Sequence, residues 1–138
     1  MPEHDAGRVL ALDYGVKRTG VAISDPTGTV VRPLEPVLKA NSSDGLATVA
    51  RLIAAHDVAR IVVGLPTGLG GDETQQTARS RSFAARLRQE VTIPVELHDE
   101  RFTSKLADRT RAATGTDASR DSLAACHLLE SWMEAGRA

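Results

Sequence analysis

The stretch RIVVGLP, residues 60–66, is the feature that most limits how this chain can fold. No polar residue interrupts its apolar run, which predicts a strand that is covered on both faces. A helical pattern precedes it, from a cap within residues 42–44 to about Ala55, and another follows from about Glu73 to Glu90. A buried strand between two helices is typical of a parallel sheet with helices packed on its faces.

The chain before this unit follows a different pattern. Val9–Asp13 and Gly20–Ser24 read as two strands with a short connection, and Thr29–Leu38 reads as a third. Pro33 and Pro36 place the third strand at an edge, because proline cannot donate a hydrogen bond to a neighbouring strand. Short connections between consecutive strands predict an antiparallel arrangement.

The chain after this unit supplies one more strand, PVELHDE at residues 94–100, and two helices, at residues 103–113 and 119–135. The predicted order is therefore β-β-β-α-β-α-β-α-α. We expect an α/β fold with a mixed five-stranded sheet, three antiparallel strands and then two parallel ones, flanked by helices. The ribonuclease H-like fold shares this order. A length of 138 residues suits one domain over residues 1–138.

Composition excludes several classes of protein. No apolar run approaches the roughly 20 residues that a membrane span requires, and the polar start MPEHDAGR does not resemble a signal peptide. The single cysteine, Cys126, excludes an internal disulfide framework. We therefore expect a soluble cytoplasmic protein that does not bind membranes. A net charge of −1 gives no global attraction to nucleic acid.

Carboxylates from distant segments are predicted to approach one another. Asp13 ends the first strand, and Asp99 and Glu100 end the last one. If these strands are parallel neighbours, their carboxyl ends meet where ligands gather in open α/β sheets. Asp121 shares one face of the last helix with apolar residues and therefore points toward the protein body. Those apolar residues are Ala125, Leu128 and Trp132.

Each carboxylate also has an ordinary structural explanation. Asp13 could cap a turn, Asp99 and Glu100 could be solvated charges, and Asp121 could favour the start of its helix. Their coincidence points instead to a divalent cation, because unpaired carboxylates brought together raise one another's pKa. Mg²⁺ prefers such oxygen ligands, and two ions can activate water for phosphodiester hydrolysis.

A glycine-rich segment and four arginines have two open interpretations each. VGLPTGLGGDETQQT, residues 63–77, could bind a phosphate at the helix start or simply connect a strand to a helix. The arginines of the next helix could follow a phosphate backbone or lie over apolar surface. They are Arg79, Arg81, Arg86 and Arg88. His98, Cys126 and His127 are interpreted as structural.

Four segments resemble the motifs of one family. They are LALDYGVKRTGVAISD, IVVGLPTGLGGDETQQTARSRSFAARL, HDERFTS and RDSLAACHLLESWM. Each motif is short, but the four occur in order from about Arg8 to Met133. The chain is thereby similar to the YqgF/RuvX family, ribonuclease H-like proteins described as pre-16S rRNA nucleases or Holliday-junction resolvases.

The resemblance implies a metal-dependent nuclease that hydrolyses phosphodiester bonds in structured nucleic acid. Its acidic residues, both catalytic and metal-binding, would be Asp13, Glu100 and Asp121, with Mg²⁺ or Mn²⁺ in a two-metal arrangement. Its phosphate-binding residues would be Lys17, Arg18 and Arg101. The expected substrate is the 5′ end of precursor 16S rRNA, in ribosome biogenesis.

Other readings remain open at this point. The substrate could be a four-way DNA junction, whose symmetry would favour a homodimer. The segment before Asp121, ATGTDASRD, is less basic than in many relatives, which weakens the case for nucleic-acid binding there. A non-catalytic nucleic-acid-binding module of the same fold is a second class. An actin-like ATPase is a third, although such proteins need two domains of this kind.

Overall fold

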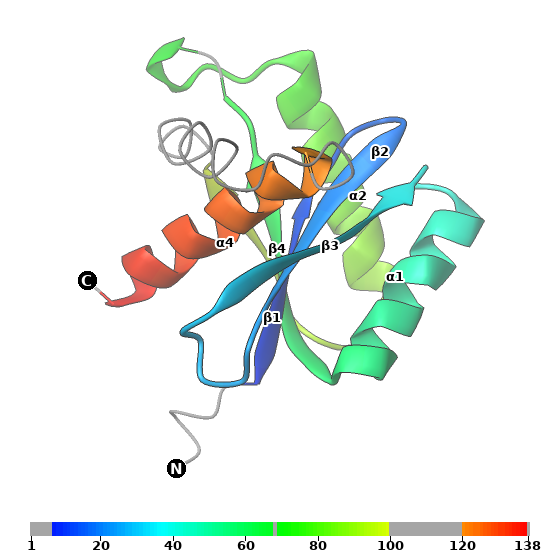
Figure 1. Cartoon of the computed structure of the whole chain (residues 1–138). Helices are drawn as coiled ribbons and strands as arrows, with labels where there is room; N and C mark the ends of the chain where they lie inside the picture. Colours follow the sequence, from blue (N-terminus) through cyan, green and yellow to red (C-terminus); the bar gives the residue numbers. More distant parts are fainter. Residues whose placement is uncertain (1–6, 68, 100–119, 138) are drawn as a thin grey trace.

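The computed structural model describes residues 7–67, 69–99 and 120–137, and its centre is one mixed sheet (Figure 1). The five strands lie in the order β3-β2-β1-β4-β5. Their bounds are β1 Arg8–Asp13, β2 Arg18–Ser24, β3 Val31–Leu38, β4 Val58–Leu65 and β5 Val95–Asp99. Pairs β1–β2 and β2–β3 are antiparallel, and pairs β1–β4 and β4–β5 are parallel. The predicted mixed sheet is confirmed.

The strand order corrects one expectation. β1 and β5 run parallel, but they are not neighbours, because β4 lies between them. Two strand spacings separate them by about 10 Å. The carboxyl ends of β1 and β5 therefore lie at the same end of the sheet without adjoining each other. We call this end, where β1 finishes at Asp13 and β2 begins, the Asp13 end.

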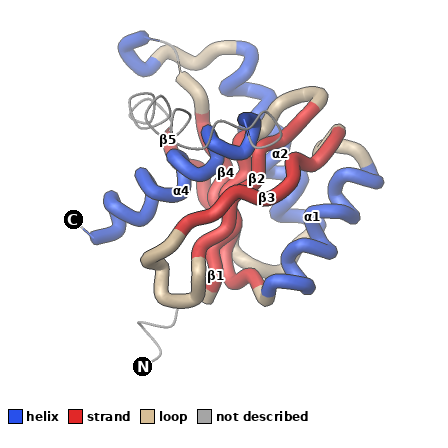
Figure 2. The backbone as a smooth tube through the Cα atoms, viewed as in Figure 1, coloured by secondary structure: helices blue, strands red, loops and turns tan. Residues whose placement is uncertain are grey.

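Two helices cover one face of the sheet, which we call the α1/α2 face (Figure 2). Helix α1, Ser43–His56, begins at a cap in which the Ser42 hydroxyl accepts a hydrogen bond from the amide of Gly45. Helix α2, Gln75–Glu90, buries Phe83 and Leu87. The core on this face is built mainly from aliphatic residues of the strands, such as Leu10, Leu12, Ile61 and Val63.

Helix α4, Arg120–Arg137, covers the opposite face, which we call the α4 face (Figures 1 and 2). Ala125, Leu128 and Leu129 are buried there. The helix crosses the strands, because its start contacts β2 and β3 while Ser131 and Trp132 reach β5. The helix predicted over residues 103–113 lies outside the described residues.

The edge position predicted for β3 is confirmed, and three element starts differ from expectation. β2 begins at Arg18 rather than Gly20, so the connection from β1 is shorter than predicted. β3 begins at Val31 rather than Thr29, because Asp25 binds the amides of residues 29 and 30 within a turn. β4 begins at Val58, directly after α1 ends in a left-handed residue, Asp57.

Candidate active site

Asp13 lies at the last position of the central strand and is half-buried. Alternation along β1 places Leu10 and Leu12 in the core of the α1/α2 face, and Val9 and Ala11 in the core of the α4 face. Alternate residues of a strand point to the same face of the sheet, so the side chain of Asp13 lies on the α4 face with that of Ala11. Helix α4, which carries Asp121, packs on this face.

Two glycines flank Asp13 on that face. Gly20 is its register partner on β2. On the other side, Leu12 pairs with Val63, so the next step along both strands brings Asp13 level with Gly64. Each glycine is two residues from a residue of the α4-side core, Gly20 from Ala22 and Gly64 from Val62, so both face the α4 side. The space beside the carboxylate is thus free of strand side chains on both sides. The position of Gly64 beside Asp13 could not be predicted from the sequence, because it becomes visible only with the β1–β4 register.

The start of α4 is fastened beside this space by Ser122. Its hydroxyl accepts a hydrogen bond from the amide of Val21 at 3.1 Å and donates one to the carbonyl of Leu34 at 2.6 Å. Val21 and Leu34 are register partners next to an irregularity in the β2–β3 ladder, so the hydroxyl stands between two strands. Val21 also pairs with Leu12, one step from Asp13.

Asp121 directly precedes Ser122 in the first turn of α4. The structure therefore brings the backbone of this predicted site residue to the Asp13 end of the sheet. Sequence reasoning did not find Ser122, because a serine one residue after a helical aspartate reads as ordinary helix-start chemistry.

Asp99 has a different placement. Leu97 packs into the α1/α2-side core. Asp99 is two residues further along the same strand, so its side chain lies on the α1/α2 face, opposite to that of Asp13. Its carboxylate accepts a hydrogen bond from the Thr67 hydroxyl at 3.4 Å. Of the two carboxylates considered at the end of this strand, Asp99 is therefore not on the Asp13 side. Glu100 and Arg101 lie outside the described residues.

The connection from β1 to β2 carries the two predicted cations, Lys17 and Arg18, and both are exposed. The connection is tight at Gly15, where a Cβ atom would meet the carbonyl oxygen of Arg18 at 2.4 Å. Tyr14 is held from the α1/α2 side, since its ring stacks on Phe83 with centroids 4.5 Å apart. Lys17 and Arg18 are thus presented to solvent at the Asp13 end.

Candidate nucleophiles elsewhere are explained structurally. Cys126 is buried in α4, and burial, followed by the charge of Glu130, raises the pKa of its thiol to about 12. His98 exchanges a 2.9 Å hydrogen bond with Ser131. Burial lowers the pKa of His98, against the opposing influence of Asp99 and Glu96, so it is neutral at pH 7. The structural interpretation of His98 is confirmed.

The donor chemistry of the Asp13 end suits a divalent cation. A carboxylate oxygen is a hard ligand, and the two glycines beside Asp13 place no side chain against it from the adjacent strands. Within residues 7–67, 69–99 and 120–137, no three His, Cys, Asp or Glu side chains are grouped closely enough to hold a metal ion. A complete ligand set at Asp13 therefore requires groups beyond these, and Glu100 and the Asp121 side chain are the predicted ones.

Contacts around helix α2 favour the structural interpretation of the glycine-rich segment and of the arginines that follow it. Thr74 and Thr77 form a capping box, so two of the amides that a phosphate would need are already occupied. Among the arginines, Arg81 pairs with Glu73, Arg86 binds Asn41, and Arg88 donates to the carbonyl of Val95. Three of the four arginines are therefore engaged within the chain.

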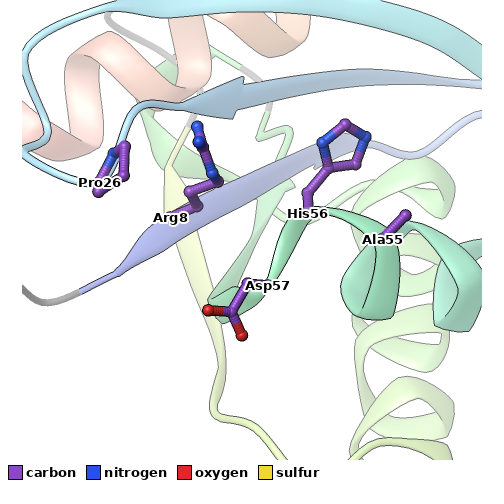
Figure 3. A pocket seen from close by; sticks show the side chains of 5 residues that line it. All are labelled: Arg8, Pro26, Ala55, His56 and Asp57. Carbon is purple, nitrogen blue, oxygen red and sulfur yellow. The ribbon is translucent and has the colours of Figure 1, made fainter.

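A separate cavity of about 320 Å³ lies at the opposite end of β1 (Figure 3). It is lined by Arg8, Pro26, Ala55, His56 and Asp57. Arg8 is the first residue of β1 and Asp13 the last, so this cavity is not part of the candidate site. The figure shows Arg8 and His56 rising on one side of the ribbon and Asp57 pointing away from them.

No described helix is long and apolar enough to cross a membrane.

Comparison with known proteins places these features in a family. The family described as "RuvX: Holliday junction resolvase" matches residues 7–135. A Koribacter versatilis protein named "Putative pre-16S rRNA nuclease" is 38% identical over 133 residues, which cover 93% of this chain and 87% of that protein. A Sulfurihydrogenibium protein of the same name is 36% identical over 132 residues, covering 92% and 90%.

A solved structure agrees at the level of the fold. Thermus thermophilus RuvC in complex with a Holliday junction substrate superimposes with a TM-score of 0.56 at 15% identity, over 95% of this chain and 96% of that one. This likeness shows that the mixed five-stranded sheet with its helices is a ribonuclease H-like fold. Together with the match over residues 7–135, this establishes that the chain belongs to the RuvX (YqgF) family.

Proposed function

We propose that this protein is a divalent-metal-dependent nuclease that hydrolyses phosphodiester bonds in structured nucleic acid. One observation carries the proposal. Asp13 ends the central strand on the α4 face, between two glycines, where Ser122 also fastens the start of α4. A carboxylate whose neighbours on both adjacent strands carry no side chain can be approached closely by a ligand, and its hard oxygens suit a divalent cation.

We assign the proposed roles beginning with the three acidic residues. Asp13, Glu100 and Asp121 would hold Mg²⁺ or Mn²⁺, and such an ion would supply Lewis-acid activation of water and stabilisation of negative charge on the leaving oxygen. Ser122 keeps the start of α4 against β2 and so sets the distance between the backbones that carry Asp121 and Asp13. Lys17 and Arg18 attract the substrate's phosphates at the exposed β1–β2 connection, and Arg101 is the third proposed phosphate ligand.

The first substrate to test is the 5′ region of precursor 16S rRNA. The relatives' names support this choice, because they refer to a pre-16S rRNA nuclease at 36–38% identity over most of the chain. A four-way DNA junction is the second substrate, supported by the family description. A homodimer would match the symmetry of that junction.

The test compares Asp13→Asn with the wild type on both substrates, with Mg²⁺ or Mn²⁺. We expect Asp13→Asn to abolish cleavage and to leave the circular dichroism spectrum unchanged. Asp57→Asn is the matched control, because it makes the same chemical change at the far end of the sheet. Asp57 has a φ of 54°, which asparagine adopts readily. This control is expected to cleave at the wild-type rate.

Two results would overturn the proposal. Equal turnover by Asp13→Asn and wild type would remove Asp13 from the chemistry. Absence of cleavage with either metal on either substrate, together with binding that survives a chelator, would instead favour the non-catalytic nucleic-acid-binding module. Glu100→Gln and Asp121→Asn are expected to behave as Asp13→Asn does.

A further inference from the structure

Two of the chain's three lysines meet at the Asp13 end of the sheet. Lys17 precedes β2 and Lys39 follows β3, and the last register pair of these strands is Arg18 with Leu38. The amide of Lys39 donates a 2.9 Å hydrogen bond to the carbonyl of Lys17. This extends the ladder by one step and holds the two lysine backbones side by side.

The backbone of Lys39 adopts a conformation that lysine rarely adopts. Its φ is 46°, in the left-handed region where glycine and asparagine are favoured. The conformation is held firmly, because the amide and the hydroxyl of Ser42 both donate to the Lys39 carbonyl, at 2.9 and 2.7 Å. Gly45 allows this close packing, since a Cβ atom there would lie 2.1 Å from that carbonyl oxygen.

A non-glycine residue held in a strained backbone conformation is a reason to look for a function of its side chain. Lys39 lines a cavity of about 360 Å³, which we call the lysine cavity. Its lining residues are Tyr14, Val16, Lys17, Lys39, Asn41 and Ser42, and none of them is acidic. Among the described residues, neither lysine is paired with a carboxylate.

The floor of the lysine cavity is held in place from α2. Arg86 donates to the carbonyl of Asn41 at 2.5 Å and to its side-chain oxygen at 3.2 Å. Because the amide oxygen of Asn41 accepts this bond, its NH₂ group remains a donor. The cavity therefore combines two ammonium groups, which no carboxylate of the described residues pairs, with a neutral donor, and this set suits a phosphate.

We propose that the lysine cavity binds a backbone phosphate of the nucleic-acid substrate, adjacent to the phosphate that is cleaved at Asp13. This inference rests on the proposed nuclease function and adds Lys39 and Asn41 to its substrate site. The connection 14–17 lies between Asp13 on the α4 face and the cavity on the α1/α2 side, so a chain bound at both crosses the Asp13 end.

The surroundings of the cavity fit backbone binding without base selection. Val16 and Leu38 are 56% and 66% exposed, so they offer apolar contact to sugars. The Tyr14 ring is already stacked on Phe83 and is not a free platform for a base. We therefore expect the lysine cavity to contribute affinity that depends on salt and not on sequence.

The experiment measures binding of the precursor-rRNA hairpin and the four-way junction as a function of salt, with Asp13→Asn in every protein so that nothing is cleaved. Lys39→Asn removes the charge and places a residue that favours the left-handed backbone. We expect Lys39→Asn to weaken binding by about three- to tenfold and to reduce the slope of log K against log salt by about 0.7 to 0.9. Its melting temperature should equal or exceed that of the parent.

Two further variants complete the design. Lys39→Arg keeps the charge and is expected to restore the affinity and the salt slope. Arg32→Gln removes an exposed cation from the far end of the same strand and is expected to change neither. In proteins with Asp13 intact, Lys39→Asn should raise KM with little change in kcat, because a flanking phosphate contact is the same in the ground state and the transition state.

An unchanged affinity and salt slope in Lys39→Asn would overturn the proposal while the nuclease function stands, provided that Asp13→Asn abolishes cleavage. Loss of affinity in Lys39→Asn that Lys39→Arg does not restore would also overturn it, because the charge would not be the cause. If the wild type neither binds nor cleaves either substrate, the proposed function and this inference fail together.

Discussion

The Ser122 hydroxyl is fully buried and joins two strands, because it lies between the amide of Val21 and the carbonyl of Leu34. Ser122→Ala should therefore lower the free energy of unfolding by about 1–3 kcal/mol, the cost of leaving buried polar groups unpaired. Urea denaturation measures this change. Ser82→Ala is the control, because Ser82 lies on the exposed side of α2 and its change should be close to zero.

Ser122→Ala should also affect the metal site. The start of α4 loses its attachment to β2, so the folded variant should need a higher Mg²⁺ concentration for half-maximal cleavage than the wild type. A variant that is destabilised but has an unchanged Mg²⁺ requirement would limit Ser122 to a structural role. A variant as stable as the wild type would contradict the hydrogen-bonding argument itself.

A second prediction at the scale of one residue concerns the effect of Gly64 on the cleavage rate. It is buried within β4, has no positive φ, and lies level with Asp13 on the α4 face. Gly64→Ala therefore suits the strand backbone but adds a methyl group to the space beside the carboxylate. We expect the cleavage rate to fall by about ten- to a hundredfold, because small displacements at a reacting centre are costly.

The control for Gly64→Ala is Gly136→Ala, near the end of α4, where an added Cβ has nothing within 4 Å. Gly136→Ala should keep full activity. Steady-state kinetics with the better of the two substrates compares the variants, and their thermal melting shows that both remain folded. Wild-type rates in Gly64→Ala would show that the space beside Asp13 is not used.

Among the elements, the turn between β2 and β3 has a definite pH dependence. The Asp25 carboxylate accepts hydrogen bonds from the Thr27 hydroxyl and from the amides of Val30 and Thr29, at 2.9 and 2.7 Å for the amides. These bonds, with Thr27 first, hold the pKa of Asp25 far below its ordinary value of 3.8. A depressed pKa means that the ionised carboxylate stabilises the folded state above the unfolded pKa.

This contribution should be fully present at neutral pH and should be lost as the pH falls below about 3.8 toward the folded-state pKa. Asp25→Asn should therefore be less stable than the wild type at pH 7, and the difference should shrink at pH 2–3. Denaturant unfolding at both pH values measures it. Asp72→Asn, at an exposed position without these contacts, should show no such convergence. A difference that is constant with pH would contradict the prediction.

The elements themselves could be predicted from local pattern. The unbroken run 60–66 predicted a strand buried on both faces, and Ile61 and Val62 indeed lie in the two opposite cores. Pro33 and Pro36 correctly predicted the edge position of β3. Each of these properties can be predicted from one short segment, because the apolar run and the missing amide of proline are local features of the sequence.

What could not be predicted is how the elements meet. The order that puts β4 between β1 and β5, and the register that aligns Gly64 with Asp13, depend on crossovers between distant segments. Ser122 can join β2 and β3 because the pairing of these strands is irregular beside Val21. The sequence around Ser122 does not predict this irregularity. The structure places the start of α4 near Asp13. The acidic set Asp13, Glu100 and Asp121 itself remains a prediction.

Over the whole molecule, the net charge of −1 conceals an uneven distribution. Lys17, Arg18 and Lys39 are all exposed at the Asp13 end, and Lys17 and Lys39 line one cavity there. Internal pairs such as Arg60 with Glu96 and Arg81 with Glu73 neutralise other arginines. Association with a polyanion is therefore expected to be local and salt-sensitive rather than driven by the net charge.

Metal binding should be visible in the stability of the whole chain. A ligand that binds only the folded state stabilises it by RT ln(1 + [L]/Kd), which is about 1.4 kcal/mol at ten times Kd. Mg²⁺ should thus raise the melting temperature of the wild type by a few degrees, and a chelator should reverse the shift. Asp13→Asn should lose this shift, because it removes a ligand charge. Asp57→Asn and Lys39→Asn should keep it, since neither changes the carboxylate set, and equal shifts in Asp13→Asn and wild type would place the metal elsewhere.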